Sequence, residues 1–248
     1  MIRTSLKNSL FSQCQNLSLL FLLASLVVLL SVPTASATTV TYPYAIEYSN
    51  GTPPAGAAPW LTAVFDDENT PGTVKLKMTA SNLTGTEFVS KWLFNLNPAI
   101  SPSDISFSAP TKTGGNGFDN PTISKATNAF NAGPDMEYDI EFGFATSGMG
   151  GGIHRFGVGE MVEYLITGSG SASGLVALDF YEFSEPGNMG VGGPYRTGAH
   201  VQGIGAGGAL SGWITVDRRI RPDGMIPEPA TWMLMALALG SLGFRRTK

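Results

Sequence analysis

Apolar and polar residues alternate along much of the chain between residues 38 and 222. In residues 136–144 the side chains of Tyr138, Ile140, Phe142 and Phe144 fall on one side of an extended chain and acidic side chains fall on the other. A two-residue period is typical of a β-strand with one buried face. The same alternation, or a short apolar run, predicts eight further strands at residues 40–48, 60–65, 73–80, 88–96, 105–107, 162–167, 175–183 and 213–216.

The segments between these predicted strands are rich in residues that favour turns. The chain has 31 Gly and 16 Pro residues, and no stretch of useful length has a helical period. Short strands joined by such turns predict an all-β fold, namely an antiparallel β-sandwich or jelly-roll-like single domain over residues 38–222. The Gly-rich stretches at 148–152 and 187–212 are expected to be loops.

Both ends of the chain are apolar and differ from the middle. Arg3 and Lys7 precede an apolar run at residues 17–30. A positive segment followed by a short apolar run is the pattern of a secretory signal peptide, which would form a helix in the membrane.

The cleavage site of this signal peptide is also visible. Pro33 breaks the apolar run, and Ala35 and Ala37 supply the small side chains that signal peptidase accepts. The sequence therefore predicts a signal peptide over residues 1–37, cut after Ala37, and an uncleaved signal anchor is the alternative. The one cysteine, Cys14, lies within it, so the mature chain is expected to contain no disulfide.

The C-terminal end has three parts in a fixed order. These are Pro227-Glu228-Pro229, an apolar segment at residues 230–244, and a basic end that includes Arg245 and Arg246. This arrangement over residues 223–248 resembles the PEP-CTERM sorting signal of Gram-negative bacteria. The resemblance covers only about the last 24 residues together with the signal peptide.

The resemblance implies an export route. An exosortase-type membrane protease would process the chain, which would be anchored transiently in the inner membrane and then reach the cell surface or the medium. Proteins with this signal share a route that accompanies exopolysaccharide production, and they do not share one biochemical activity. The resemblance therefore implies a structural role in the envelope or extracellular matrix.

The length of the apolar tail agrees with a transient anchor. Residues 230–244 would form a helix of about 22 Å, whereas the hydrocarbon core of a bilayer is about 30 Å thick. The prolines before it stop a helix from extending upstream. A permanent single-span anchor is the alternative, and a eukaryotic lipid-anchor tail would end in apolar residues.

The charge of residues 38–222 bears on which classes of partner they can bind. Residues 38–222 contain 17 Asp and Glu against 10 Lys and Arg. Binding to a phosphate backbone needs the opposite balance, so nucleic acid is not an expected partner.

Catalytic chemistry has little support in the sequence. His154 and His200 lie far apart in Gly-rich segments, and no zinc or nucleophile motif accompanies them. A glycoside hydrolase would need paired carboxylates, for which the candidates are Glu137, Asp139, Glu141, Asp179 and Glu182. Charges at every second residue also describe a solvated strand face. We therefore expect no enzymatic activity and no cofactor, and a glycan-active hydrolase is the least favoured alternative.

Two further groups are candidates for binding. Asp66, Asp67 and Glu68 offer oxygen ligands for calcium in a turn, and a solvated acidic turn is the simpler interpretation. Trp60 and Trp213 are candidate contacts for sugar rings on a sheet face, whereas Trp92 is expected in the core. The alternative to a structural role is accordingly a carbohydrate-binding module.

Overall fold

The computed structural model describes residues 37–115, 117–132, 136–147, 154–186 and 193–222. These residues form two antiparallel β-sheets, which confirms the all-β prediction. Most of the predicted signal peptide, including Ala35, lies outside the described residues, as do the predicted C-terminal helix and the sorting residues Pro227, Glu228, Pro229, Arg245 and Arg246.

The first sheet has six strands. Their spatial order is β1 (Thr39–Tyr44), β3 (Leu61–Asp66), β4 (Thr73–Thr79), β11 (Met161–Gly168) and β6 (Ile105–Phe107), and β7 (Thr111–Thr113) pairs with β11 as well. Inward-facing residues alternate with outward-facing ones, as in β4, where Val74, Leu76 and Met78 are fully buried.

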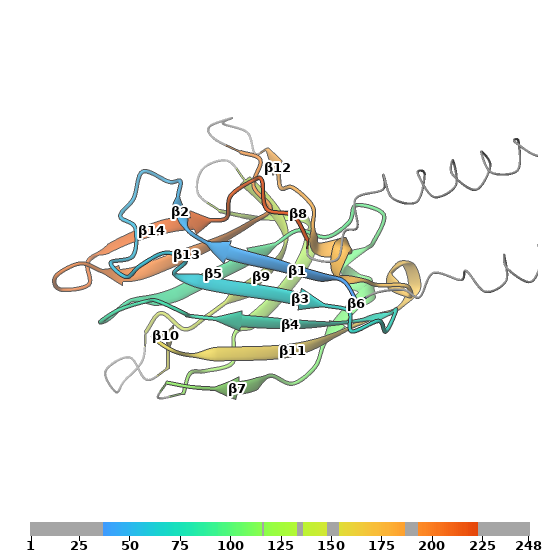
Figure 1. The fold of residues 1–248 in the computed structure, drawn as a ribbon, viewed down its shortest axis with the longest axis horizontal. Helices are drawn as coiled ribbons and strands as arrows, with labels where there is room; N and C mark the ends of the chain where they lie inside the picture. The colour runs from blue at the N-terminus through green and yellow to red at the C-terminus, as the bar shows by residue number, and fades with distance from the viewer. Residues whose placement is uncertain (1–36, 116, 133–135, 148–153, 187–192, 223–248) are drawn as a thin grey trace, which may run out of the picture. The chain divides into compact units, whose positions relative to one another are not determined.

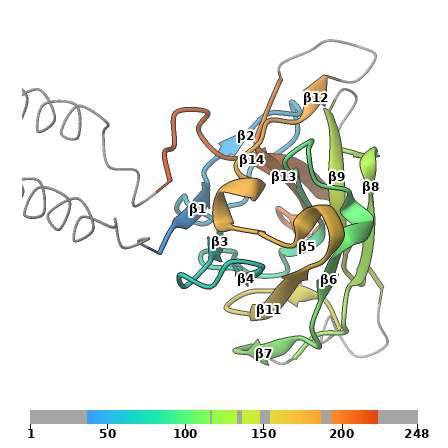
Figure 2. The same ribbon diagram turned by 90° about the vertical axis from the view of Figure 1, so that its right-hand side faces the viewer.

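The second sheet has eight strands and lies against the first (Figures 1 and 2). Their order is β12 (Glu185–Pro186), β9 (Met136–Gly143), β5 (Phe88–Phe94), β13 (Thr197–Ile204), β14 (Leu210–Thr215) and β2 (Ile46–Glu47), with β10 (Phe156–Gly157) on β5 and β8 (Thr122–Asn131) on β9. Three 3-10 helices complete the described elements: η1 (Pro102–Asp104), η2 (Gly170–Ala172) and η3 (Ala177–Phe180).

Aromatic side chains fill the space between the sheets. The Trp92 ring meets the Tyr44 ring edge-on at 5.1 Å between centroids, and Phe65 stacks on Phe180 at 4.3 Å. Trp92 is fully buried, as expected from the sequence. Such rings bury large apolar areas and so dominate the stability of the sandwich.

The predicted strand at residues 175–183 is wrong, because η3 occupies its centre. The Asp179 carboxylate accepts a hydrogen bond from the Val176 backbone N–H at 2.9 Å, which caps the helical turn. Ala177 and Phe180, three residues apart, are the residues that η3 buries. The spacing of the buried residues is thus helical within a segment whose apolar residues resemble a strand.

The predicted strand at residues 40–48 is in fact two strands in different sheets. β1 ends at Tyr44, and the Ala45 N–H donates to Thr215 O at 3.0 Å, which directs the chain to the second sheet. Ile46, which alternation along one strand over residues 40–48 would place on the same face as Tyr42 and Tyr44, is 41% exposed and belongs to β2.

A central strand, β13, lies in a segment that the sequence assigned to a Gly-rich loop. Gly198 is needed there, because a Cβ atom on it would come within 3.2–3.3 Å of the Tyr48 and Tyr138 hydroxyls and the Ala132 methyl group. Gly198 therefore reflects close packing on a strand.

Candidate functional site

Two neighbouring strands carry aromatic rings on the face of the eight-stranded sheet that points away from the core. Ala199 of β13 and Ile214 of β14 are paired and fully buried in the core. Side chains alternate along a strand, so the adjacent pair, His200 and Trp213, points to the outer face. Their rings stack with centroids 4.8 Å apart and planes 21° apart. Both side chains are half-buried, so part of this stack is exposed to solvent.

The stack continues into a line of side chains across four strands. Lys91 of β5 is in register with His200, and its Nζ lies 2.6 Å from Oε2 of Glu141 on β9. We call Trp213, His200, Lys91 and Glu141 the outer-face row. It is aromatic at one end and charged at the other.

A second apolar cluster lies on the same outer face. Its buried members are Leu93, Ala132, Met136 and Tyr138, and the half-buried Tyr48, Phe130, Tyr195 and Trp213 pack against them. The Tyr48 and Tyr195 rings are 4.6 Å apart, and the Arg218 guanidinium lies 4.7 Å from the Tyr195 ring centroid. Because Trp213 belongs to both groups, the aromatic surface extends from the outer-face row to Tyr195.

His200 is held in one tautomer. Its Nδ1 lies 2.9 Å from Ser90 Oγ and 3.3 Å from Gln202 Nε2. An amide nitrogen can only donate, so Nδ1 accepts and Nε2 carries the hydrogen. Burial, and secondly the positive charge of Lys91, lower the pKa of His200 below its usual 6.5. The ring is therefore neutral at pH 7, and its Nε2–H is a hydrogen-bond donor.

The sequence placed both histidines in Gly-rich loops, which is wrong for His200. The alternation of Ala199 and Val201 inside with His200 and Gln202 outside is the signal that identifies its strand. His154 follows a Gly-rich stretch and forms an exposed hydrogen bond with Asp119, with 3.0 Å between Nδ1 and Oδ1. Exposed pairs contribute little to stability.

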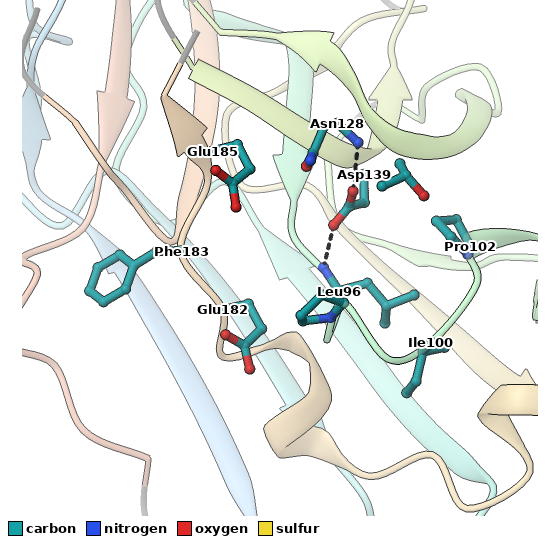
Figure 3. Close-up of a pocket in the computed structure, with 10 residues that line it drawn as sticks. Leu96, Ile100, Pro102, Asn128, Asp139, Glu182, Phe183 and Glu185 are labelled. Carbon is teal, nitrogen blue, oxygen red and sulfur yellow. Dashed lines mark hydrogen bonds between the residues drawn. The ribbon is translucent and has the colours of Figure 1, made fainter. Parts of the chain in front are cut away.

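Two of the five carboxylates that the hydrolase alternative would use, Asp139 and Glu182, line a pocket of about 120 Å³. Glu182, Phe183 and Glu185 line one side of this pocket, and Asn128 and Asp139 lie opposite (Figure 3). Small-molecule sites usually enclose several hundred Å³. This pocket would accommodate a single small group only.

Asp139, in the wall of this pocket, accepts hydrogen bonds from the backbone. It is 6% exposed, although the sequence placed it on a solvated face with Glu137 and Glu141. Its two oxygens accept from the backbone N–H groups of Leu96 and Asn128, each at 2.8 Å (Figure 3). Both oxygens are thus engaged in holding the end of β5 and the irregular part of β8.

Asp179, the other candidate carboxylate, lies in η3 and not on a strand. Its second oxygen accepts from Asn97 Nδ2 at 3.0 Å. Its two oxygens therefore organise local backbone and side-chain contacts.

The acidic turn at residues 66–68 does not bring its carboxylates together around a common point. Asp66 accepts from the Glu68 N–H at 2.9 Å, and Glu68 forms an ion pair with Lys75. Asp67 is buried and accepts from Thr38 N at 2.9 Å. Within the described parts of the chain, no group of three or more His, Cys, Asp or Glu side chains has an arrangement that could hold a metal ion.

Trp60, the second predicted sugar contact, lies in the core with 8% of its surface exposed. Its indole Nε1 donates to Gly56 O at 2.7 Å. Of the two predicted tryptophans, only Trp213 presents ring surface on a sheet face.

Comparison with known proteins matches residues 226–246 to the model of the PEP-CTERM protein-sorting motif. The chain carries a PEP-CTERM sorting domain. This PEP-CTERM protein is therefore an exported, exosortase-processed protein with a transient membrane association. No curated protein and no solved structure matches the chain.

Among the described residues of the PEP-CTERM protein, no helix is long and apolar enough to span a bilayer. The predicted apolar tail at residues 230–244 lies outside the described residues.

Proposed function

We propose that this protein is a non-catalytic component of the cell envelope or extracellular matrix that binds exopolysaccharide through the outer face of its eight-stranded sheet. The observation that carries the proposal is the stack of His200 on Trp213 in the outer-face row. The proposal joins a structural role with the carbohydrate-binding alternative. Signal peptidase and an exosortase are its processing partners.

The chemistry of the outer face suits a sugar polymer. A pyranose ring has a flat face of C–H groups, which packs on an aromatic ring, and a rim of hydroxyl groups, which exchange hydrogen bonds. Trp213 and Tyr195 supply ring surface, while the His200 Nε2–H and the Lys91–Glu141 pair supply donors and acceptors beside it. An open sheet face suits a long chain better than an enclosed small molecule.

The test is binding of the full-length chain, produced with its own signal peptide in a Gram-negative host. Its mobility is measured by affinity electrophoresis in gels that contain a soluble β-glucan, a xylan or an alginate. We expect at least one polysaccharide to retard the protein and Trp213→Ala to weaken that binding by about tenfold or more.

Two controls accompany this test. Leu165→Ala removes a side chain that is 45% exposed on β11 of the other sheet, and it should leave binding unchanged. Trp213→Phe keeps a flat ring and separates loss of binding from loss of folding. Equal effects of Trp213→Ala and Leu165→Ala, or no retardation in any gel, would contradict the proposal. Release of new reducing ends would favour the hydrolase alternative instead.

A further inference from the structure

The buried Asp67 is bonded to the backbone nitrogen that signal peptide removal would convert into a chain terminus. The predicted cleavage site lies between Ala37 and Thr38. Thr38 N donates to Asp67 Oδ1 at 2.9 Å, and Asp67 N donates to Thr38 O at 3.3 Å. This pair of contacts fixes Thr38 against the turn after β3.

Asp67 is deeply placed for an acidic residue. It is 6% exposed, and its second oxygen accepts from the Ala177 N–H of η3 at 3.4 Å. A buried carboxylate is costly unless a cation or several donors compensate it. No Lys, Arg or His within the described part of the chain forms an ion pair with it.

The neighbouring charges are already engaged with other groups. In the same turn Glu68 pairs with Lys75 of β4, and Asp66 accepts from the Glu68 N–H. On η3, Asp179 accepts from Val176 N and Asn97 Nδ2. Asp67 therefore accepts from three backbone N–H groups, those of Thr38, Asn69 and Ala177, and the Thr38 nitrogen is the one that cleavage would turn into a cation.

We propose that Asp67 is the binding site for the α-ammonium group of the mature chain, so that signal peptide cleavage itself creates the counter-ion of this buried carboxylate. Hydrolysis of the Ala37–Thr38 peptide bond consumes one water and leaves a carboxylate on Ala37 and an ammonium group on Thr38. The neutral N–H···O bond at Thr38 thereby becomes a charge-assisted bond to Asp67. Bonds of that kind are roughly twice as strong as neutral ones.

The contact between Asp67 and Thr38 lies next to the start of an edge strand, where an added ion pair has most effect on stability. β1 begins at Thr39, forms an edge of the six-stranded sheet and pairs only with β3 among the described strands. Its first residue is therefore prone to fraying. The ion pair fastens that end to the β3–β4 turn and, through Ala177, to η3. Cleavage would thus stabilise the folded state of the mature domain.

The experiment uses the full-length chain exported and processed by a Gram-negative host. N-terminal sequencing first identifies the mature end, which should be Thr38. The chain is then unfolded in urea and the α-amine is acetylated near neutral pH, where the free amine, with its ordinary pKa of about 8, reacts before lysine with its pKa of about 10.4; the urea is removed afterwards to refold the chain. Urea unfolding is followed by tryptophan fluorescence in mild detergent.

Acetylation should raise the unfolding equilibrium constant of the processed wild type about tenfold, equivalent to about 1.4 kcal/mol. The same shift is expected in Asp66→Asn, the matched control in the same turn, and no shift is expected in Asp67→Asn. A mature end other than Thr38, or an equal effect of acetylation in Asp67→Asn, would overturn the proposal.

A measurement on the wild type covers the case in which Asp67→Asn does not fold. Reductive methylation with ¹³C-formaldehyde labels the α-amine, and its titration is read by NMR. A pKa above the usual range of about 7.7–8.0 supports the ion pair, and a value within that range rejects it.

Discussion

The His200 imidazole lies nearly parallel to the Trp213 indole, 4.8 Å away, on adjacent strands of the sheet. The contact makes Trp213 a stiffer platform than a tryptophan on a loop. It also connects that platform to Lys91 and Glu141 through the pairing of β13 with β5. The outer-face row is thus carried by four strands of one sheet.

His200 should make the stability of the domain depend on pH. Because burial and Lys91 lower its pKa in the folded state, the unfolded chain takes up the proton first as the pH falls. The contribution of His200 to the free energy of unfolding is complete above about pH 6.5. It declines as the pH falls from there through the lower pKa of the folded state. Urea midpoints between pH 7.5 and 5 should show this decline, and His200→Gln should reduce it. An unchanged pH profile in His200→Gln would contradict the prediction.

Asp139→Ala should destabilise the domain by about 2–4 kcal/mol. The change leaves the Leu96 and Asn128 N–H groups without their acceptors in a buried place. Urea denaturation measures the loss. Glu137→Ala, on the same strand but half-exposed, should cost no more than about 0.5 kcal/mol. Comparable losses of stability in the two variants would show that the hydrogen bonds from Leu96 and Asn128 to Asp139 do not stabilise the domain.

Gly198→Ala should cost about 1–3 kcal/mol through overpacking, since the new methyl group would press on Tyr48, Ala132 and Tyr138. The melting temperature should fall accordingly. Gly174→Ala is the matched control, because a methyl group there meets no atom within 4 Å. We expect that variant to be neutral or slightly stabilising. Equal melting temperatures for the two variants would contradict the close packing around Gly198.

Two buried tyrosines should respond oppositely to loss of the hydroxyl group. The Tyr44 hydroxyl accepts from Trp92 Nε1 and is bonded to Thr197, so Tyr44→Phe should cost about 1–3 kcal/mol. The Tyr164 hydroxyl is buried and has no hydrogen-bond partner among the described residues. Tyr164→Phe should therefore be neutral or stabilising, as judged by thermal unfolding. A larger loss in Tyr164→Phe than in Tyr44→Phe would refute this assignment.

The strands that could be predicted from the sequence are those in which large apolar residues alternate with polar ones. β4 and β9 have this pattern, and both were found. β13 has small inward residues such as Ala199, and its glycines resemble a loop, so the alternation is weak. η3 was missed because a single capping contact from Asp179 decides its conformation.

The candidate site was predictable only in part, for the same reason. Trp213 is a possible sugar contact from the sequence alone. Its stacking partner His200 lies on β13, which the sequence pattern assigns to a Gly-rich loop. Trp60 follows a Pro-rich lead that resembles an exposed loop. Its burial depends on packing into the core between the sheets, and its indole donates locally to Gly56 O, four residues upstream.

The pairing of β2 with β14 has a consequence for the timing of folding. Among the described strands β2 pairs only with β14, which ends at Thr215, and the sorting motif begins at residue 226. Export delivers the N-terminal strands first, so the eight-stranded sheet cannot be completed until nearly the whole chain has crossed the membrane. Contacts of such long sequence separation form slowly. The domain can therefore close only at about the time when its tail reaches the membrane, because β2, near the start of the domain, must wait for β14, near its end.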